Sequence, residues 1–338
     1  MKKKTRNIFF LFGLVAVIVM LFTFKVSFEQ LWQDILRAGY WLIAIMFLWL
    51  VLYVMNTWTW NIIIRGSGEC SIPFWKLFKV TITGFALNYA TPAGLMGGEP
   101  YKIMELTPYV GAQRATSSVL LFAMMHIFSH FWFWITSIVL YLLFMPFDLG
   151  MSIILSLMTV FCLAGIYLFV KGYKNGMVMK VFRFIGKIPG CKKWAFDFIN
   201  NHKEELTNID RQISELQGQN KKSFYGSFFL EYIGRIFQTF EIFFMLQLFD
   251  VGGSDVMMFV HSLMILAFTS LFANLLFFMP LQLGGREGGF AMSTAQMGMT
   301  NDIGMFISII CRVRELVWTT IGLFLMKIGN SIAVKEKV

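Results

Sequence analysis

The sequence predicts an all-α polytopic membrane protein. Hydrophobic residues make up 57% of the 338 residues and charged residues only 14%, whereas a soluble domain is about 45–50% apolar. Several segments are apolar over more than the ~20 residues that a helix needs to cross a bilayer. We therefore expect a core that forms between membrane helices.

The net charge of +10 reflects where basic residues sit in membrane proteins. Lys and Arg concentrate in cytoplasmic loops, so the charge does not require a nucleic-acid partner, and we predict none. The four cysteines lack metal-binding or redox spacing, and no phosphate-binding GxxxxGK[ST] loop is present. The sequence therefore predicts no metal, no cofactor and no ATP hydrolysis by the chain itself.

The N-terminal third begins with a predicted span over Ile8–Phe24. Several lysines precede it, but no small-residue cleavage site follows, so we expect a retained helix. Ser27–Gly39 has one apolar stripe and a capping box of Ser27 and Gln30, which is typical of a helix lying in the membrane interface. Further spans bring the expected total to about six with Ile8–Phe24: Trp41–Ile64, Ala115–Phe144, Met151–Val170, Ser223–Leu248 and Ile303–Met326.

Residues 171–222 form the sizeable polar region of the chain. They hold eleven basic against five acidic residues, so we expect them in the cytoplasm. Within them, Ile199, Leu206, Ile209, Ile213 and Leu216 recur at helical spacing and predict a helix ending near Gly218. We expect the apolar face of this helix to rest on the membrane or on other helices, or the helix to bind a partner.

The distribution of basic residues also predicts two re-entrant hairpins. If Phe74–Ala90 crossed the bilayer fully, Lys102 and the basic segment would lie outside, against the positive-inside rule. We expect this segment to enter from the cytoplasm, turn, and return as Glu99–Leu106. Met257–Phe278 enters from the outside and turns near Gly284-Gly285, which leaves both termini in the cytoplasm.

The two hairpins form an internal repeat. In Asn88–Pro100 and in Asn274–Gly289, an Asn precedes a Pro, and Gly-Gly and Glu follow. Pro92 to Glu99 and Pro280 to Glu287 both span seven positions. Such an inverted-topology repeat is typical of transporters whose substrate site lies near the midplane. We expect one membrane domain over 1–338, with an N-terminal part (1–40), repeat one (41–170), the basic segment (171–222) and repeat two (223–338).

Three motifs resemble the membrane domain of the lysylphosphatidylglycerol synthase/flippase family. They are Thr91-Pro92 through Gly97-Gly98-Glu99-Pro100, Pro280 through Gly288, and the late arginine within Cys311–Trp318. The resemblance covers about residues 5–330. It implies movement of a phosphate-bearing or polyprenyl-linked lipid between leaflets. In larger members a cytosolic domain does the aminoacyl transfer, and because this chain stops at Val338, we expect a free-standing member without that domain.

The candidate substrate site lies between the two Gly-Gly-Glu turns. Glu99 and Glu287 either cap half-helices, whose positive ends favour acidic groups, or face a polar cavity as ion sites. Arginine suits bidentate phosphate binding, so Arg286 and either Arg312 or Arg314 are the preferred head-group ligands. The predicted site residues are Asn88, Pro92, Gly97, Gly98, Glu99, Lys102, Pro280, Gly284, Gly285, Arg286, Glu287, Arg312 and Arg314.

Other charged and polar residues in the spans have less specific interpretations. Glu231 and Arg235 lie four residues apart, so Arg235 either pairs locally with Glu231 or contacts a lipid. His126 and His130 lie one turn apart on a charge-free span and are expected to be hydrogen-bonded core or cavity residues rather than metal ligands.

Three functions fit the sequence. The first is a lipid translocase. It is driven by an ion gradient, with a proton or sodium as the coupling ion, or by consumption of the lipid on the far side, and a homo-oligomer is left open. The second is a lipid-modifying enzyme or enzyme subunit of the phosphatidylglycerol lysyltransferase type. The third is a membrane scaffold whose basic segment recruits partners.

Overall fold

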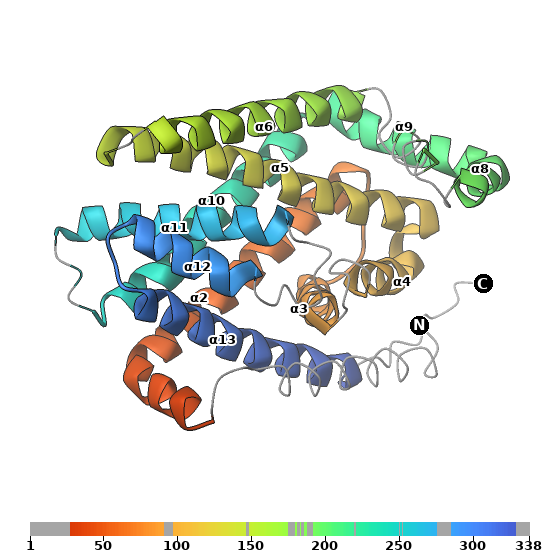
Figure 1. Cartoon of the computed structure of the whole chain (residues 1–338). Coiled ribbons are helices and arrows are strands. Elements are labelled where there is room, and N and C mark those ends of the chain that lie inside the picture. Colours follow the sequence, from red (N-terminus) through yellow and green to blue (C-terminus); the bar gives the residue numbers. More distant parts are fainter. Residues whose placement is uncertain are drawn as a thin grey trace. The chain divides into compact units, whose positions relative to one another are not determined.

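The computed structural model describes residues 28–90, 97–146, 149–174, 180, 183, 186–187, 192–219, 221–249, 251, 253–275 and 285–328. These residues are almost entirely α-helical (Figure 1), which confirms the predicted all-α class. The helices are α2 (Phe28–Gly66), α3 (Phe74–Ala90), α4 (Gly98–Val110), α5 (Ala112–Phe144), α6 (Leu149–Lys174), α8 (Lys192–Asn201), α9 (Lys203–Gln219), α10 (Lys221–Leu246), α11 (Asp255–Leu275), α12 (Gly285–Gln296) and α13 (Asn301–Lys327).

The helices group into two compact units. The first unit comprises Met1–Tyr53, Pro73–Glu105 and Phe240–Val338, and the second comprises Val54–Ile72 and Leu106–Thr239. Three of the four boundaries fall inside α2, α4 and α10, and the fourth lies between α2 and α3. Both predicted hairpin regions, α3 with α4 and α11 with α12, belong largely to the first unit.

Helix α2 contains a break at the predicted boundary between the interfacial helix and the second span. Gly39 has φ 52° and ψ −131°, which L side chains rarely adopt and glycine tolerates. The stretch before the break exposes Trp32 and Leu36, each at 61%. An interfacial helix presents such a face to lipid. Ser27, the predicted cap residue, and the predicted span Ile8–Phe24 lie outside the described residues.

Four described helical segments are long and apolar enough to cross a membrane by length and composition. They are Leu31–Gly66, Ala112–Phe144, Leu149–Lys171 and Asp255–Leu275. The first three contain predicted spans. The fourth is α11, for which we predicted a re-entrant course, so that course and the inverted repeat stay predictions. Predicted spans in α10 and α13 are not among the four, and α13 carries Arg312, Arg314 and Glu315 in its middle.

Helices α3 and α13 pack closely in the first unit, at Gly322. A Cβ atom built on Gly322 would lie 2.5 Å from the Cβ of Ala86 and 2.9 Å from the carbonyl oxygen of Ile82. The hydroxyl of Thr83 donates to the carbonyl of Gly322 over 3.1 Å. Small residues that bring helix backbones together are a common means of association in membranes.

Gly322→Val is therefore expected to destabilise the first unit by roughly 1–3 kcal/mol, because the added side chain overpacks the α3–α13 contact. Thermal unfolding of the full chain in detergent micelles measures the effect. Gly226→Ala on α10 is the matched control, since no atom lies within 4 Å of a Cβ built there. Equal melting temperatures for the Gly322 variant and the wild type would contradict this packing.

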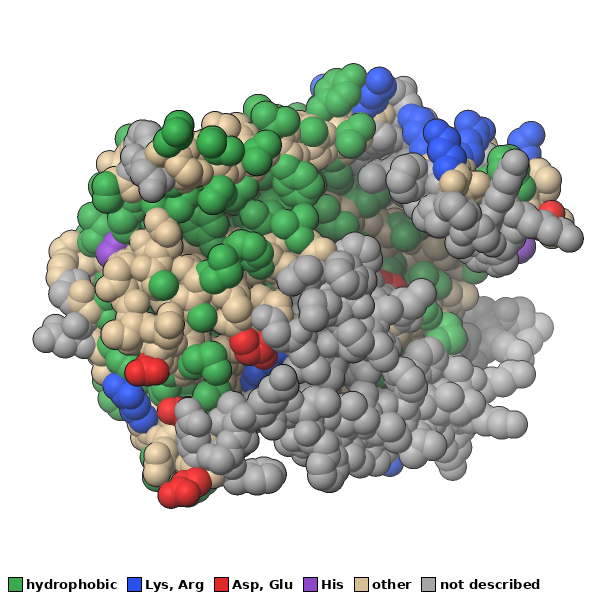
Figure 2. Space-filling model, viewed as in Figure 1, with side chains coloured by type: hydrophobic (Ala, Val, Ile, Leu, Met, Phe, Trp, Pro, Cys, Tyr) green, Lys and Arg blue, Asp and Glu red, His purple; other side chains and the backbone are tan. Residues whose placement is uncertain are grey.

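In the second unit, α9 confirms the helix predicted within residues 171–222, and part of its apolar face packs on other helices. Leu206 and Ile209 are buried, and α9 packs against α5 and α6. The predicted Ile199 lies on the separate helix α8, since α8 ends at Asn201 and α9 begins at Lys203. The outer side of α6 is covered by apolar side chains, and Lys and Arg side chains gather near α8 and α9 (Figure 2).

Candidate functional site

Six charged side chains meet in the interior of the first unit. We call them the arginine cluster: Glu241 of α10, Arg286 and Glu287 of α12, and Arg312, Arg314 and Glu315 of α13. The first turn of α12 supplies the motif residues Arg286 and Glu287, directly after Gly285. Charged residues inside apolar segments are costly unless they pair, and the pairs of this cluster meet that requirement.

Glu315 is the centre of the arginine cluster and is fully buried, with 0% exposure. Its carboxylate accepts a hydrogen bond from the guanidinium of Arg286. Glu315 Oε2 lies 3.8 Å from Arg312 Nη1, and Oε1 lies 3.7 Å from Arg314 Nη1. One carboxylate thus contacts all three arginines and holds α12 against α13.

The contacts of Arg314 indicate a structural role for this side chain. Its Nε donates to Glu241 Oε1 over 2.9 Å and its Nη2 donates to Oε2 over 3.4 Å, a two-pronged geometry that planar guanidinium favours. Its Cζ lies 3.7 Å from the ring centroid of Trp49, which adds a cation–π contact. Because Arg314 is only 2% exposed, these partners leave it little access to a ligand.

Arg312 and Glu287 form the more accessible edge of the arginine cluster. Arg312 Nη2 donates to Glu287 Oε1 over 2.9 Å, and Arg312 Nε donates to the same oxygen over 3.3 Å. Glu287 is 28% exposed, the largest value in the cluster, followed by Arg286 at 13%. With three arginines and three glutamates, the cluster has no net formal charge when all six side chains are ionised.

The first Gly-Gly-Glu motif forms a second charged group, at the start of α4. Gly98 N donates to Asn88 Oδ1 over 2.8 Å, and Asn88 Nδ2 donates to Glu99 Oε1 over 3.2 Å. Lys102 Nζ lies 3.1 Å from the same glutamate oxygen. A Cβ atom at Gly98 would collide with the carbonyl oxygen of Gly84, so only glycine fits where α4 begins against α3.

Aromatic rings connect these two charged groups inside the first unit. The Lys102 ammonium lies 5.4 Å from the ring centroid of Phe85, and Phe85 meets Tyr53 edge-on at 5.3 Å. Tyr53 in turn contacts Trp49 at 5.8 Å, the ring that covers Arg314. The structure therefore places residues of both predicted turns along one continuous set of contacts.

Most predicted site residues fall into these two groups. Asn88, Gly98, Glu99 and Lys102 come together with the buried Gly97, and Gly285 opens the helix that carries two members of the arginine cluster. Pro92, Pro280 and Gly284 lie outside the described residues.

Sequence reasoning missed three members of the site: Glu241, Glu315 as a site residue, and Trp49. The sequence does contain a signal for the two glutamates, because any carboxylate inside an apolar span needs a partner. Glu241 lies within the predicted span Ser223–Leu248, and Glu315 lies one residue after Arg314. No comparable sequence signal singles out Trp49 among ten tryptophans.

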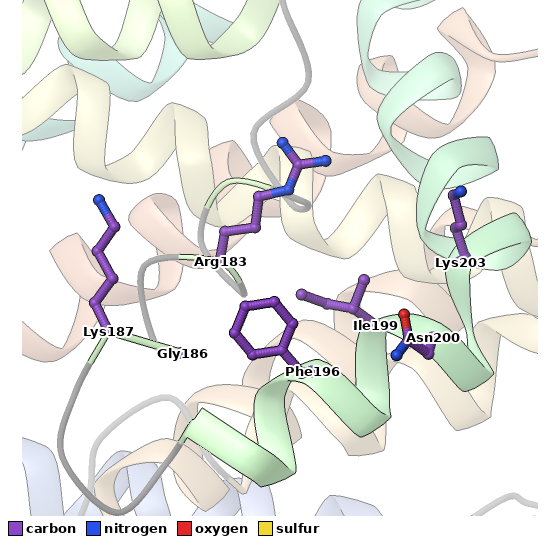
Figure 3. Close-up of a pocket in the computed structure, with 7 residues that line it drawn as sticks. All are labelled: Arg183, Gly186, Lys187, Phe196, Ile199, Asn200 and Lys203. Atoms are coloured by element: carbon purple, nitrogen blue, oxygen red, sulfur yellow. The ribbon is translucent and has the colours of Figure 1, made fainter.

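The second unit contains a basic pocket of about 720 Å³ (Figure 3). The pocket is lined by three basic side chains, those of Arg183, Lys187 and Lys203, together with the phenyl ring of Phe196 and the aliphatic side chain of Ile199. None of the predicted site residues lines it. Its lining residues are Arg183, Gly186, Lys187, Phe196, Ile199, Asn200 and Lys203.

Comparison with known proteins gives one family match. Neither the curated proteins nor the solved structures give a significant match to this chain. The family model described as lysylphosphatidylglycerol synthase TM region matches residues 10–322, which include every predicted site residue and the whole arginine cluster. The chain therefore belongs to the lysylphosphatidylglycerol synthase TM region family and is a multi-pass membrane protein.

Proposed function

We propose that the chain moves a phosphate-bearing lipid, such as a phospholipid or a polyprenyl-linked lipid, between the leaflets of the cell membrane. The observation that carries this proposal is the pair of Gly-Gly-Glu motifs. Each lies at or beside the start of a short helix, α4 or α12, and each glutamate there contacts a basic side chain. Family membership supports a lipid-handling membrane domain.

The chemistry of the arginine cluster suits a phosphate head group. Guanidinium groups bind phosphate through paired hydrogen bonds and keep their charge when buried. Arg286 and Arg312 are more exposed, at 13% and 6%, than Arg314, which is occupied by Glu241 and Trp49. We assign head-group contact to Arg312 and Arg286 and a positioning role to Arg314.

The predicted topology completes the proposal. Both termini and the basic segment lie in the cytoplasm, and the two hairpins enter from opposite sides, so that their turns meet near the midplane. An ion gradient, or consumption of the lipid on the far side, provides the driving force. Single cysteines at Thr107 and Thr300 should accordingly be labelled by impermeant reagents from opposite sides of the membrane, and labelling from one side would exclude the inverted repeat.

Leaflet exchange in proteoliposomes tests the function. The purified full chain should increase the rate at which a fluorescent phospholipid of the inner leaflet becomes accessible to an impermeant quencher. The rival enzymatic function predicts instead that lysyl-tRNA and phosphatidylglycerol yield an aminoacylated lipid in the same vesicles. Product formation without leaflet exchange would favour the enzyme.

Glu99→Gln is expected to slow leaflet exchange by about tenfold or more, equivalent to ~1.4 kcal/mol in the barrier. The amide keeps the size of the side chain but removes the charge that Lys102 and Asn88 contact. Glu204→Gln on the exposed face of α9 is the matched control. Gln can still cap a helix, so wild-type exchange by the Glu99 variant would reduce this glutamate to a capping role.

A further inference from the structure

A separate polar triad lies between α5 and α10 in the second unit. His126 Nδ1 lies 2.9 Å from Glu231 Oε2, and Arg235 Nη2 lies 2.8 Å from His126 Nε2. Arg235 also donates to the Ser129 hydroxyl over 3.3 Å and to the His126 carbonyl over 3.4 Å. The glutamate and the arginine, four residues apart on α10, thus hold the two sides of one imidazole.

The partners of His126 determine where its ring proton sits. A guanidinium only donates hydrogen bonds, so Nε2 must accept from Arg235 and carries no proton. The ring proton is then on Nδ1, where it donates to the Glu231 carboxylate. The triad therefore fits one protonation state: neutral imidazole between a carboxylate and a guanidinium.

The burial of Glu231 and Arg235 makes this protonation state of the triad sensitive to one added proton. Glu231 is 4% and Arg235 8% exposed, whereas His126 is 34% exposed, so the imidazole is the accessible member. Among the described residues, Glu231 Oε1 and His130 Nδ1 are buried polar atoms without a hydrogen-bond partner. His130 meets the His126 ring edge-on at 5.4 Å. Glu231 Oε1 is therefore a spare acceptor beside the imidazole.

The charged groups on neighbouring elements are few. Glu231 and Arg235 come from α10, and His130 from α5 itself. Helix α6, which packs against α5, has no charged residue before Lys171. Helix α9, which also packs against α5, carries Lys203, Glu204, Glu205, Asp210, Arg211 and Glu215, of which Asp210 is buried.

We propose that His126, with Glu231 and Arg235, is a proton-binding site that couples lipid movement to a proton gradient. A proton from water bonds to His126 Nε2, and the hydrogen bond from Arg235 breaks because two N–H donors then face each other. The imidazolium keeps its bond to Glu231, and the site gains one positive charge. Loss of the same proton to water lets Arg235 return. The coupling role, though not the proton site itself, rests on the proposed function.

Solid-state NMR of the full chain in vesicles tests the site without any transport measurement. Ring-labelled histidine gives four imidazole signals, one for each histidine, and His126→Gln identifies the one to follow. At neutral pH this signal should show the Nδ1–H tautomer, which is the less common form for a free imidazole. Acidification should convert it to imidazolium. In Arg235→Met the Nδ1–H preference should weaken, because the methionine side chain has no donor for Nε2. An Nε2–H tautomer in the wild type would overturn the proposal.

Leaflet exchange under a pH gradient tests the coupling. The wild-type exchange rate should change several-fold when the pH gradient is imposed. The exchange rate of His126→Gln should be the same with and without the gradient. His261→Gln, on α11 outside the triad, should keep the wild-type response. A titrating Nδ1–H signal with gradient-independent exchange would overturn the coupling role but keep the proton site. Absence of exchange in every variant, with the same signal, would instead overturn the proposed function.

Discussion

Glu315→Gln is expected to be among the most destabilising single substitutions in the first unit. The carboxylate contacts Arg286, Arg312 and Arg314 and is fully buried. Removing its charge leaves the arginine cluster with one uncompensated positive charge away from water. Removing one partner of a buried ion pair typically costs about 3–5 kcal/mol. Denaturant titration of the full chain in detergent micelles measures the loss in the free energy of unfolding.

Two further variants make this expectation specific to charge balance. Asp302→Asn removes an exposed carboxylate from the first turn of the same helix, where a helix-dipole interaction contributes about 0.3–1 kcal/mol. The double variant Glu315→Gln with Arg286→Gln removes both charges of one pair and should recover part of the stability, a coupling that a double-mutant cycle quantifies. Additive losses in the double variant would show that the two side chains do not interact.

The elements that the sequence predicted share a local signal. The change from an amphipathic stripe to a continuous apolar run predicted the boundary at Gly39, and the structure has a helix break there. Helical spacing within the basic segment predicted α9, whose Leu206 and Ile209 are buried. Spacing along one helix is a property of neighbouring residues, so it can be read without knowing the fold.

Ion pairs between residues far apart in the sequence have no such local signal. Arg314 and Glu241 pair across 73 positions, and Arg312 and Glu287 across 25. The sequence predicted that charges inside spans must be paired or functional, and the structure brings the predicted Arg286, Arg312 and Arg314 into one cluster around Glu315. The sequence allowed either a local pair of Glu231 and Arg235 or a lipid contact for Arg235, and the structure brings both side chains to His126 of α5. Which carboxylate meets which arginine depends on how α10, α12 and α13 pack.

The final expectation concerns Glu287, whose substitution should change binding and movement of the lipid in opposite directions. Glu287 neutralises Arg312 through two hydrogen bonds from that guanidinium and is the most exposed member of the arginine cluster. A lipid phosphate that reaches Arg312 must replace this carboxylate. Glu287→Gln leaves the cluster with one extra positive charge, so phosphatidylglycerol should bind about tenfold more tightly, a gain of ~1.4 kcal/mol.

Arg312→Gln should weaken the same binding by roughly 10–100-fold, because a charge-assisted hydrogen bond contributes about 1.5–3 kcal/mol. Binding of a neutral diacylglycerol should change little in either variant, since it has no phosphate for Arg312 to contact. Leaflet exchange should nevertheless fall in both variants. Without Glu287, the carboxylate that accepts two hydrogen bonds from Arg312 no longer competes with the lipid when it must leave. Without Arg312, the head group is not captured. Equilibrium binding in detergent micelles and exchange in vesicles separate the two effects, with Glu204→Gln as the control. If Glu287→Gln binds and moves phosphatidylglycerol as the wild type does, with at most ~1 kcal/mol lost in stability, then Glu287 only caps α12.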